Sequence, residues 1–186
     1  LTGLKNRRYV REFLKQIIER AKAEELRVTL FLFDIDNFKH YNDTYGHNVG
    51  DMVLKQAAVM MRRCCRAHDV IGRIGGDEFA VVFWDCPARL DKAQPTQKPK
   101  AERRGADAGH PQEALFISDR FRNQISSADF SFLGHGGKGV LTVSGGLASF
   151  SHDGMTAEEL LEQADKAMLE AKRSGKNRIY LVGKPK

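Results

Sequence analysis

A pair of glycines between two short β-rich segments is the strongest constraint that this 186-residue chain places on its own fold. Residues 69–74 and 79–84 are rich in β-branched and aromatic side chains, and Gly75 and Gly76 lie between them. This pattern predicts a β-hairpin with the glycine pair at its tip. Because glycine has no Cβ, the tip leaves room for a ligand to approach the backbone closely.

Two pairs of acidic residues accompany the hairpin. Asp77 and Glu78 follow the glycines directly, and Asp34 and Asp36 end the apolar run of residues 28–33. If the two strands lie side by side, four carboxylates converge on one edge of the sheet, where they repel each other unless a cation is present. Carboxylates gathered in this way suit a hard divalent cation. The alternative is a hairpin with a solvated acidic tip.

The remaining sequence predicts an α+β fold with a central, mainly antiparallel sheet flanked by helices. Apolar residues at three- and four-residue steps predict helices over residues 8–23, 49–66 and 114–125. The capping-box spacing between Thr156 and Glu159 predicts the start of a last helix. Further strands are expected at residues 27–34, 140–148 and 179–182, and a polar, glycine-bearing stretch precedes residue 49. The resulting core order, β-α-β-β-α-β, is the split-βαβ plan.

Composition favours one domain, residues 1–186, with a mobile surface insertion at about 87–113. That insertion holds four of the five prolines, and Leu90 is its one large aliphatic residue. It cannot bury enough apolar surface to order itself. A tolerated loop and a docking segment for a partner are both open interpretations.

The net charge of +6 favours an anionic binding partner or an anionic surface. Basic residues are spread along the chain without a Lys/Arg tract, so we expect a polyanionic nucleotide and no nucleic acid. No apolar run approaches the roughly 20 residues that a membrane span needs. The three cysteines have no metal-binding spacing, which favours reduced thiols and a cytoplasmic domain.

Residues 75–79 read Gly-Gly-Asp-Glu-Phe, and the chain resembles the GGDEF family of diguanylate cyclases over nearly its whole length. Residues 1–8 resemble the opening motif of the family, without the Asp that usually precedes it. Residues 33–39 and 42–51 resemble its metal and guanine motifs, and residues 171–178 its closing phosphate motif. The resemblance implies a fold like that of nucleotidyl cyclases and polymerase palms. It also implies a homodimer that converts two GTP into cyclic di-GMP and two pyrophosphates.

The resemblance also implies roles for matching residues. Asp77 is the candidate general base, with Glu78 beside it. Two Mg²⁺ ions, or Mn²⁺, are expected at Asp34, the carbonyl of Ile35 and Asp77, with Asp36 as a further ligand or support. The residues expected to contact GTP are Asn37, Phe38, Lys39, Asn42, His47, Asp51, Gly75, Gly76, Lys172 and Lys176.

Several of these GTP contacts have a structural alternative. Asn42 and Asp51 are expected to read guanine, but a helix end and a helix N-cap would explain them equally well. The two C-terminal lysines are expected to bind phosphate, but they would also complement a helix dipole. A lone histidine such as His47 is more often structural than catalytic.

Arg66 and Asp69 resemble the RxxD product-inhibition site of the family, with five residues between Asp69 and Gly75. The resemblance therefore implies cyclic di-GMP as both product and inhibitor. Two other functions stay open: a cyclic di-GMP receptor or scaffold without turnover, and a cyclase that makes a single-nucleotide product. The chain begins inside the opening motif, so we expect an upstream sensor domain, and possible membrane anchoring, in a longer protein.

Overall fold

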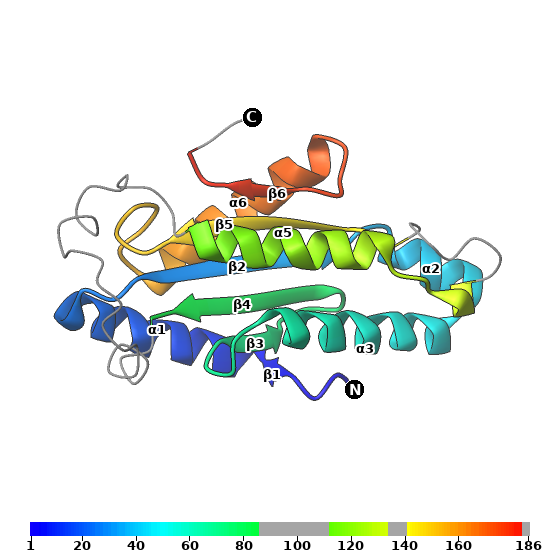
Figure 1. Ribbon diagram of the computed structural model, residues 1–186, viewed down its shortest axis with the longest axis horizontal. Helices are drawn as coiled ribbons and strands as arrows, with labels where there is room; N and C mark the ends of the chain where they lie inside the picture. Colours follow the sequence, from blue (N-terminus) through cyan, green and yellow to red (C-terminus); the bar gives the residue numbers. More distant parts are fainter. Residues whose placement is uncertain (86–111, 134–140, 184–186) are drawn as a thin grey trace, which may run out of the picture.

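The computed structural model describes residues 1–85, 112–133 and 141–183, and one six-stranded sheet runs through them. The strands are β1 (Lys5–Asn6), β2 (Val28–Ile35), β3 (Val70–Arg73), β4 (Glu78–Trp84), β5 (Val143–Ser149) and β6 (Ile179–Leu181). Their order is β1-β3-β4-β2-β5-β6 (Figure 1). The inner strands pair antiparallel, whereas β1 and β6 run parallel to their neighbours. The predicted α+β class and split-βαβ plan are confirmed.

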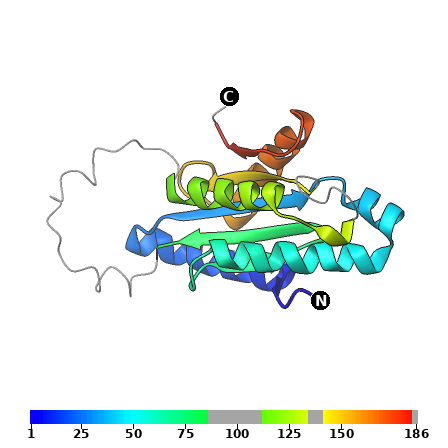
Figure 2. The same ribbon diagram turned by 45° about the vertical axis from the view of Figure 1, so that its right-hand side comes forward.

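Helices cover both faces of this sheet. They are α1 (Arg7–Glu24), α2 (Phe38–Tyr45), α3 (His47–Cys64), α5 (Gln112–Ser127) and α6 (Ala157–Arg173), with a 3-10 turn, η1 (Ser131–Leu133). Buried residues of α3 and α5 share one apolar cluster with the sheet, and those of α1 and α6 share another. Figure 2 shows α3 and α5 in front of the strands.

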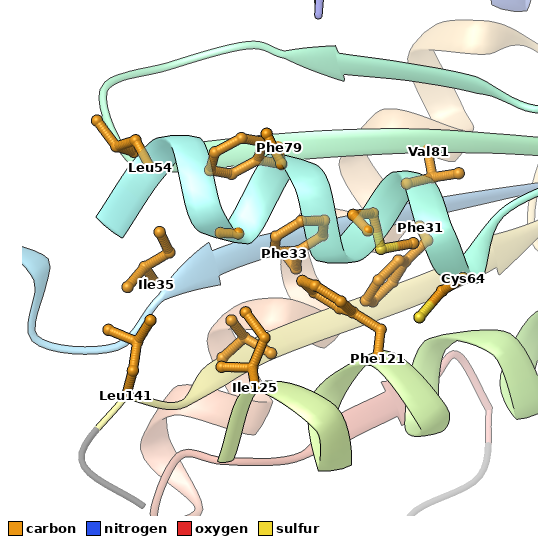
Figure 3. Packing of buried hydrophobic residues seen from close by; sticks show 14 of the residues in the cluster. Phe31, Phe33, Ile35, Leu54, Cys64, Phe79, Val81, Phe121, Ile125 and Leu141 are labelled. Carbon is orange, nitrogen blue, oxygen red and sulfur yellow. The ribbon is translucent and has the colours of Figure 1, made fainter. Parts of the chain in front are cut away.

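Strand β2 lies between β4 and β5 in the middle of the sheet, and all eight of its residues are buried. Phe31 and Phe33 belong to the cluster with α3 and α5, whereas Leu30 and Leu32 belong to the cluster with α1 and α6. Phe33 stacks on Phe79 of β4, with ring centroids 5.0 Å apart (Figure 3). A strand that is buried on both faces needs apolar side chains at every position, as this sequence supplies.

Some elements differ from the sequence prediction. Helix α2 occupies the stretch that we expected to be only polar and glycine-bearing, and Tyr41 is its one buried residue. Helix α3 runs from residue 47 to 64 rather than 49 to 66, and β5 begins at residue 143 rather than 140. The predicted insertion at 87–113 lies outside the described residues except for Gln112 and Glu113, which open α5.

Within the described ranges, no helix is both long and apolar enough to span a bilayer.

Helix α6 packs very closely on β5 because Gly146 faces it. A Cβ at this position would come within 2.1 Å of the Ala164 carbonyl oxygen and 2.5 Å of the Met168 nitrogen. Both are backbone atoms of α6, so a rotamer change cannot relieve the clash. The glycine therefore sets the distance between the sheet and the helix that carries Lys172.

We expect Gly146→Ala to lower the free energy of unfolding by about 1–3 kcal/mol, because helix and strand must separate to admit one methyl group. Urea unfolding followed by circular dichroism measures this. Gly76→Ala is the matched control, since a Cβ there meets no heavy atom within 4 Å. Equal stability of the two variants would contradict the close-packing argument.

Candidate functional site

The turn between β3 and β4 is the glycine hairpin that the sequence predicts. The Ile74 and Gly75 N–H groups both donate to the Glu78 carbonyl, at 2.9 and 3.2 Å. The Arg73 guanidinium donates to the Gly76 carbonyl at 2.6 and 3.0 Å. A Cβ on Gly75 would lie 2.4 Å from a Glu78 carboxylate oxygen, whereas Gly76 faces open space. The tip is thus braced on one side and accessible on the other.

Three of the four predicted carboxylates interact electrostatically at the end of β2. Asp34 pairs with Glu78 in the register of β2 and β4, and the Ile35 N–H donates to the Asp77 carbonyl at 3.4 Å. Asp34 is only 8% exposed. Burial raises the pKa of Asp34 to about 6; Lys172 opposes this rise, and the Asp77 and Glu78 charges add to it. The structure therefore concentrates negative charge beside the glycine turn.

This cluster suits a hard cation. Its donors are carboxylate oxygens and backbone carbonyls, and its buried Asp34 is offset by the Lys172 ammonium 3.0 Å away. The described residues do not include three acidic, His or Cys side chains gathered closely enough to hold an ion alone. Such a sparse protein shell fits Mg²⁺, which takes many of its ligands from water and substrate phosphates.

Asp36 does not join the other three carboxylates. It is 2% exposed, and it accepts hydrogen bonds from the Thr142 and Ser144 hydroxyls, both at 2.7 Å. It also accepts one from the Asn177 N–H at 3.1 Å. Both oxygens accept hydrogen bonds inside the protein, which favours the supporting role for Asp36 over the role of a metal ligand.

Two lysines from the end of α6 and the loop after it reach the same end of β2. Lys172 pairs with Asp34, and the Lys176 ammonium donates to the Asn37 side-chain oxygen at 2.5 Å. Lys39 is exposed in the first turn of α2. Lys172 and Lys176 thus lie at the acidic cluster, although they come from a part of the chain distant from β2.

The predicted guanine-reading residues also lie close together. A Cβ at Gly50 would be 1.9 Å from the Asn42 side-chain oxygen, so the amide of Asn42 rests against α3 at Gly50, the residue before Asp51. Helix α3 begins at His47, which excludes the N-cap alternative for Asp51. His47 itself is exposed at the first position of that helix. The Phe38 ring would lie 3.3 Å from the same Gly50 Cβ.

Arg66 and Asp69 form a tight turn after α3. The Arg66 N–H donates to one Asp69 oxygen at 2.8 Å; the other oxygen is buried and has no hydrogen-bond partner among the described residues. Burial raises the pKa of Asp69. Trp84 and His68 brace the turn by donating to each other's carbonyls, at 2.9 and 3.2 Å. The Arg66 guanidinium contacts Glu113 of α5.

The turn is part of a groove of about 410 Å³. Arg66 and Asp69 line it together with the N-terminal residues Gly3 and Lys5 and with Arg62 of α3. Its lining residues come from the region of β1, the end of α3 and the start of β3, whereas the acidic cluster lies at the ends of β2 and β4.

A family model described as "Diguanylate cyclase, GGDEF domain" matches residues 1–104 and 108–178. The chain belongs to the GGDEF diguanylate cyclase family. Among its relatives, the response regulator PleD of Caulobacter vibrioides is 35% identical over 185 residues, 99% of this chain and 35% of PleD. Diguanylate cyclase DgcS of Shewanella oneidensis is 35% identical over 178 residues, 95% of this chain and 50% of DgcS. The chain therefore spans between a third and a half of these relatives.

The fold of this GGDEF domain also matches solved structures. The GGDEF domain of DgcB from Caulobacter crescentus, determined in complex with c-di-GMP, superposes with a TM-score of 0.76 at 26% identity. The match covers 98% of this chain and 94% of that one.

Sequence reasoning missed the polar residues that surround the predicted site. Thr142 and Ser144 lie two residues apart at the start of β5, where side chains of alternate residues share a face. Two hydroxyl side chains at this alternate spacing were the available signal. No local pattern indicated that Glu113 would contact Arg66.

The raised pKa of Asp34 predicts a pH-dependent cost in stability. Its folded pKa of about 6 lies above its ordinary 3.8, so ionised Asp34 destabilises the metal-free fold above about pH 6. As the pH falls towards 4, the side chain is protonated in the folded protein and this cost disappears. We expect metal-free Asp34→Asn to be more stable than the wild type by about 1–3 kcal/mol at about pH 8, and equally stable near pH 4.

Urea unfolding in EDTA at the two pH values measures this difference. Asp165→Asn, which changes an exposed carboxylate on α6, is the control. If Asp34→Asn matched the wild type at both pH values, the charge strain inferred for the acidic cluster would be absent.

Proposed function

We propose that this domain is a diguanylate cyclase that condenses two GTP into one cyclic di-GMP and two pyrophosphates. The supporting observation is that Asp34, Asp77 and Glu78 lie within one cluster at the end of β2, with Lys172 and Lys176 beside it. Membership of the GGDEF family adds to this support.

Two divalent cations are part of the proposal, Mg²⁺ or alternatively Mn²⁺. Asp34, the carbonyl of Ile35 and Asp77 would hold them, since these groups offer hard oxygen donors at one place. When bound, the cations lower the pKa of a ribose 3′-hydroxyl and neutralise charge on the phosphates under attack.

The side chains of the domain would do the remaining work. Asp77, partly exposed beside the open Gly76, accepts the proton of the 3′-hydroxyl. Lys172 and Lys176 bind the triphosphate as compact positive charges. The 3′-oxygen then attacks the α-phosphorus of the second GTP, and pyrophosphate leaves.

Base choice would rest on Asn42 and Asp51. A carboxylate accepts from guanine N1–H and the exocyclic amine, and the Asn amide donates to a guanine acceptor. Adenine would leave these groups without partners, which costs binding energy at a site that excludes water. The proposed substrate is therefore GTP rather than ATP.

Each domain holds one GTP, so turnover requires two domains that meet face to face across a two-fold axis. Positioning and charge stabilisation would supply most of the acceleration. A cyclic di-GMP receptor without turnover is the second candidate. It is disfavoured because Gly75, Gly76, Asp77 and Glu78 are all present and arranged around one cluster.

Incubation with GTP and Mg²⁺, followed by nucleotide chromatography, should yield cyclic di-GMP at a rate that rises with the square of the protein concentration. We expect Asp77→Asn to lower the rate about a thousandfold, equivalent to roughly 4 kcal/mol, with an unchanged circular dichroism spectrum. Glu162→Gln, an exposed change on α6, serves as the control. A single-nucleotide product, or a fully active Asp77→Asn, would refute the proposal.

Product inhibition through Arg66 and Asp69 completes the proposed function. The buried Asp69 shapes the turn, and the Arg66 guanidinium would grip the product. Because Glu113 contacts that guanidinium, its carboxylate competes with an anionic ligand for the same positive charge.

Two substitutions at this site should therefore act in opposite directions. We expect Arg66→Ala to weaken cyclic di-GMP binding at least about tenfold and Glu113→Gln to strengthen it about threefold, as for gained or lost charged hydrogen bonds. Calorimetric titration measures both, and the fluorescence of Trp84, the one tryptophan of the chain, gives a second signal. If Arg66→Ala bound cyclic di-GMP with unchanged affinity, the product would not bind at this site.

A further inference from the structure

The carboxylate of Asp36 lies at a junction of three segments that are far apart in the sequence. It follows β2 directly, and it accepts hydrogen bonds from Thr142 and Ser144 at the start of β5. Its third donor, the Asn177 N–H, belongs to the loop between α6 and β6. The separations along the chain are 106, 108 and 141 residues.

These contacts are strong ones. Hydrogen bonds to an ionised acceptor are about twice as strong as neutral ones, and at 2.7 Å both hydroxyls stand at the short end of the usual range. Within the described part of the chain, no Lys, Arg or His nitrogen forms an ion pair with Asp36. The charge of Asp36 is therefore stabilised by neutral donors alone. A phosphate or metal ion that binds nearby has no ion pair of Asp36 to displace.

The loop that Asp36 holds has an unfavourable backbone. Gly175, Lys176 and Asn177 have φ values of 110°, 61° and 46°, in the region that side chains disfavour. Each non-glycine residue in this region costs about 1 kcal/mol or more. Such a loop keeps its shape only where the surroundings fix it.

Two contacts fix Asn177 from outside its own loop. One is the hydrogen bond to Asp36, and the other is Arg122 of α5, whose guanidinium lies 3.3 Å from the Asn177 side-chain oxygen and 3.4 Å from its carbonyl. The neighbouring Lys176 thereby reaches Asn37, the residue that follows Asp36. Lys172 pairs with Asp34 one turn earlier, at the end of α6.

We propose that Asp36 is a positioning residue that fixes Lys176 and the loop after α6 over the end of β2, where the triphosphate of GTP binds. The inference rests on the proposed function, because it concerns the phosphate subsite of that reaction. It assigns Asp36 no contact with metal or nucleotide. It also extends the functional set to Thr142, Ser144 and Asn177.

A positioning role has a different signature from that of a metal ligand. Loss of the Asp36 junction should weaken binding of GTP, which reaches Lys176 with its terminal phosphates. Binding of GMP, which lacks those phosphates, should change little. The Mg²⁺ concentration for half-maximal activity should stay the same, because Asp34 and Asp77 are untouched.

The test uses Asp36→Asn and Thr142→Val, with Ser127→Ala as a control that removes the hydroxyl of an exposed residue of α5. Calorimetry at saturating Ca²⁺ measures GTP and GMP affinities without relying on turnover. We expect GTP to bind about tenfold more weakly to Asp36→Asn and about threefold more weakly to Thr142→Val, as for one or two lost hydrogen bonds. GMP affinity should stay within about twofold, and the Asn177 amide should exchange its hydrogen faster.

Thr142→Val keeps the test decisive if Asp36→Asn does not fold, because Val matches Thr in shape. Equal weakening of GTP and GMP would overturn the proposal, and so would a shift in Mg²⁺ dependence with GTP affinity unchanged. A wild-type domain that makes no cyclic di-GMP would refute the proposed function instead. If the wild type is active and the variants bind GTP normally, the positioning role alone fails.

Discussion

The register between β2 and β4 is the constraint on which the rest of this site depends. Phe33 pairs with Phe79 and Asp34 with Glu78, so one ladder carries both the aromatic core and the carboxylates. Because side chains alternate between faces, a slip of one residue would exchange the two faces of a strand that is buried on both. The stacked rings, with centroids 5.0 Å apart, resist such a slip. The packing of the core therefore decides where the charges meet.

Two carboxylates at the end of β2 show how environment separates roles. Asp34 and Asp36 are both buried and only two residues apart. Asp34 faces other acidic side chains and a lysine, so its charge is costly and it attracts a cation. Asp36 is surrounded by hydroxyl and amide donors, so its charge is satisfied within the protein. Asp34 can therefore bind a ligand, whereas Asp36 supports the structure around that binding site.

The central strands and the glycine hairpin could be predicted because their signals are local. Apolar runs, a glycine pair and adjacent carboxylates suffice to place Asp34 beside Asp77 and Glu78. Helix α2 was missed because it buries only Tyr41 and so lacks an apolar stripe. The partners of Asp36 and the contact between Arg66 and Glu113 join segments from 47 to 141 residues apart, and no local pattern encodes them. For Asp36, residue type alone could not separate a metal ligand from an internal acceptor.

The lysines complete the electrostatic argument. Lys172 pairs with Asp34, and Lys176 donates a hydrogen bond to Asn37. Under the proposed function, a divalent cation beside Asp34 and a triphosphate beside the lysines arrive with opposite charges. The cation would replace Lys172 as the counter-charge of Asp34, and Lys172 would then be free to bind the phosphates. Each ligand would thereby lower the cost of binding the other, so the proposed function implies cooperative binding of metal and nucleotide at a site whose total charge changes little.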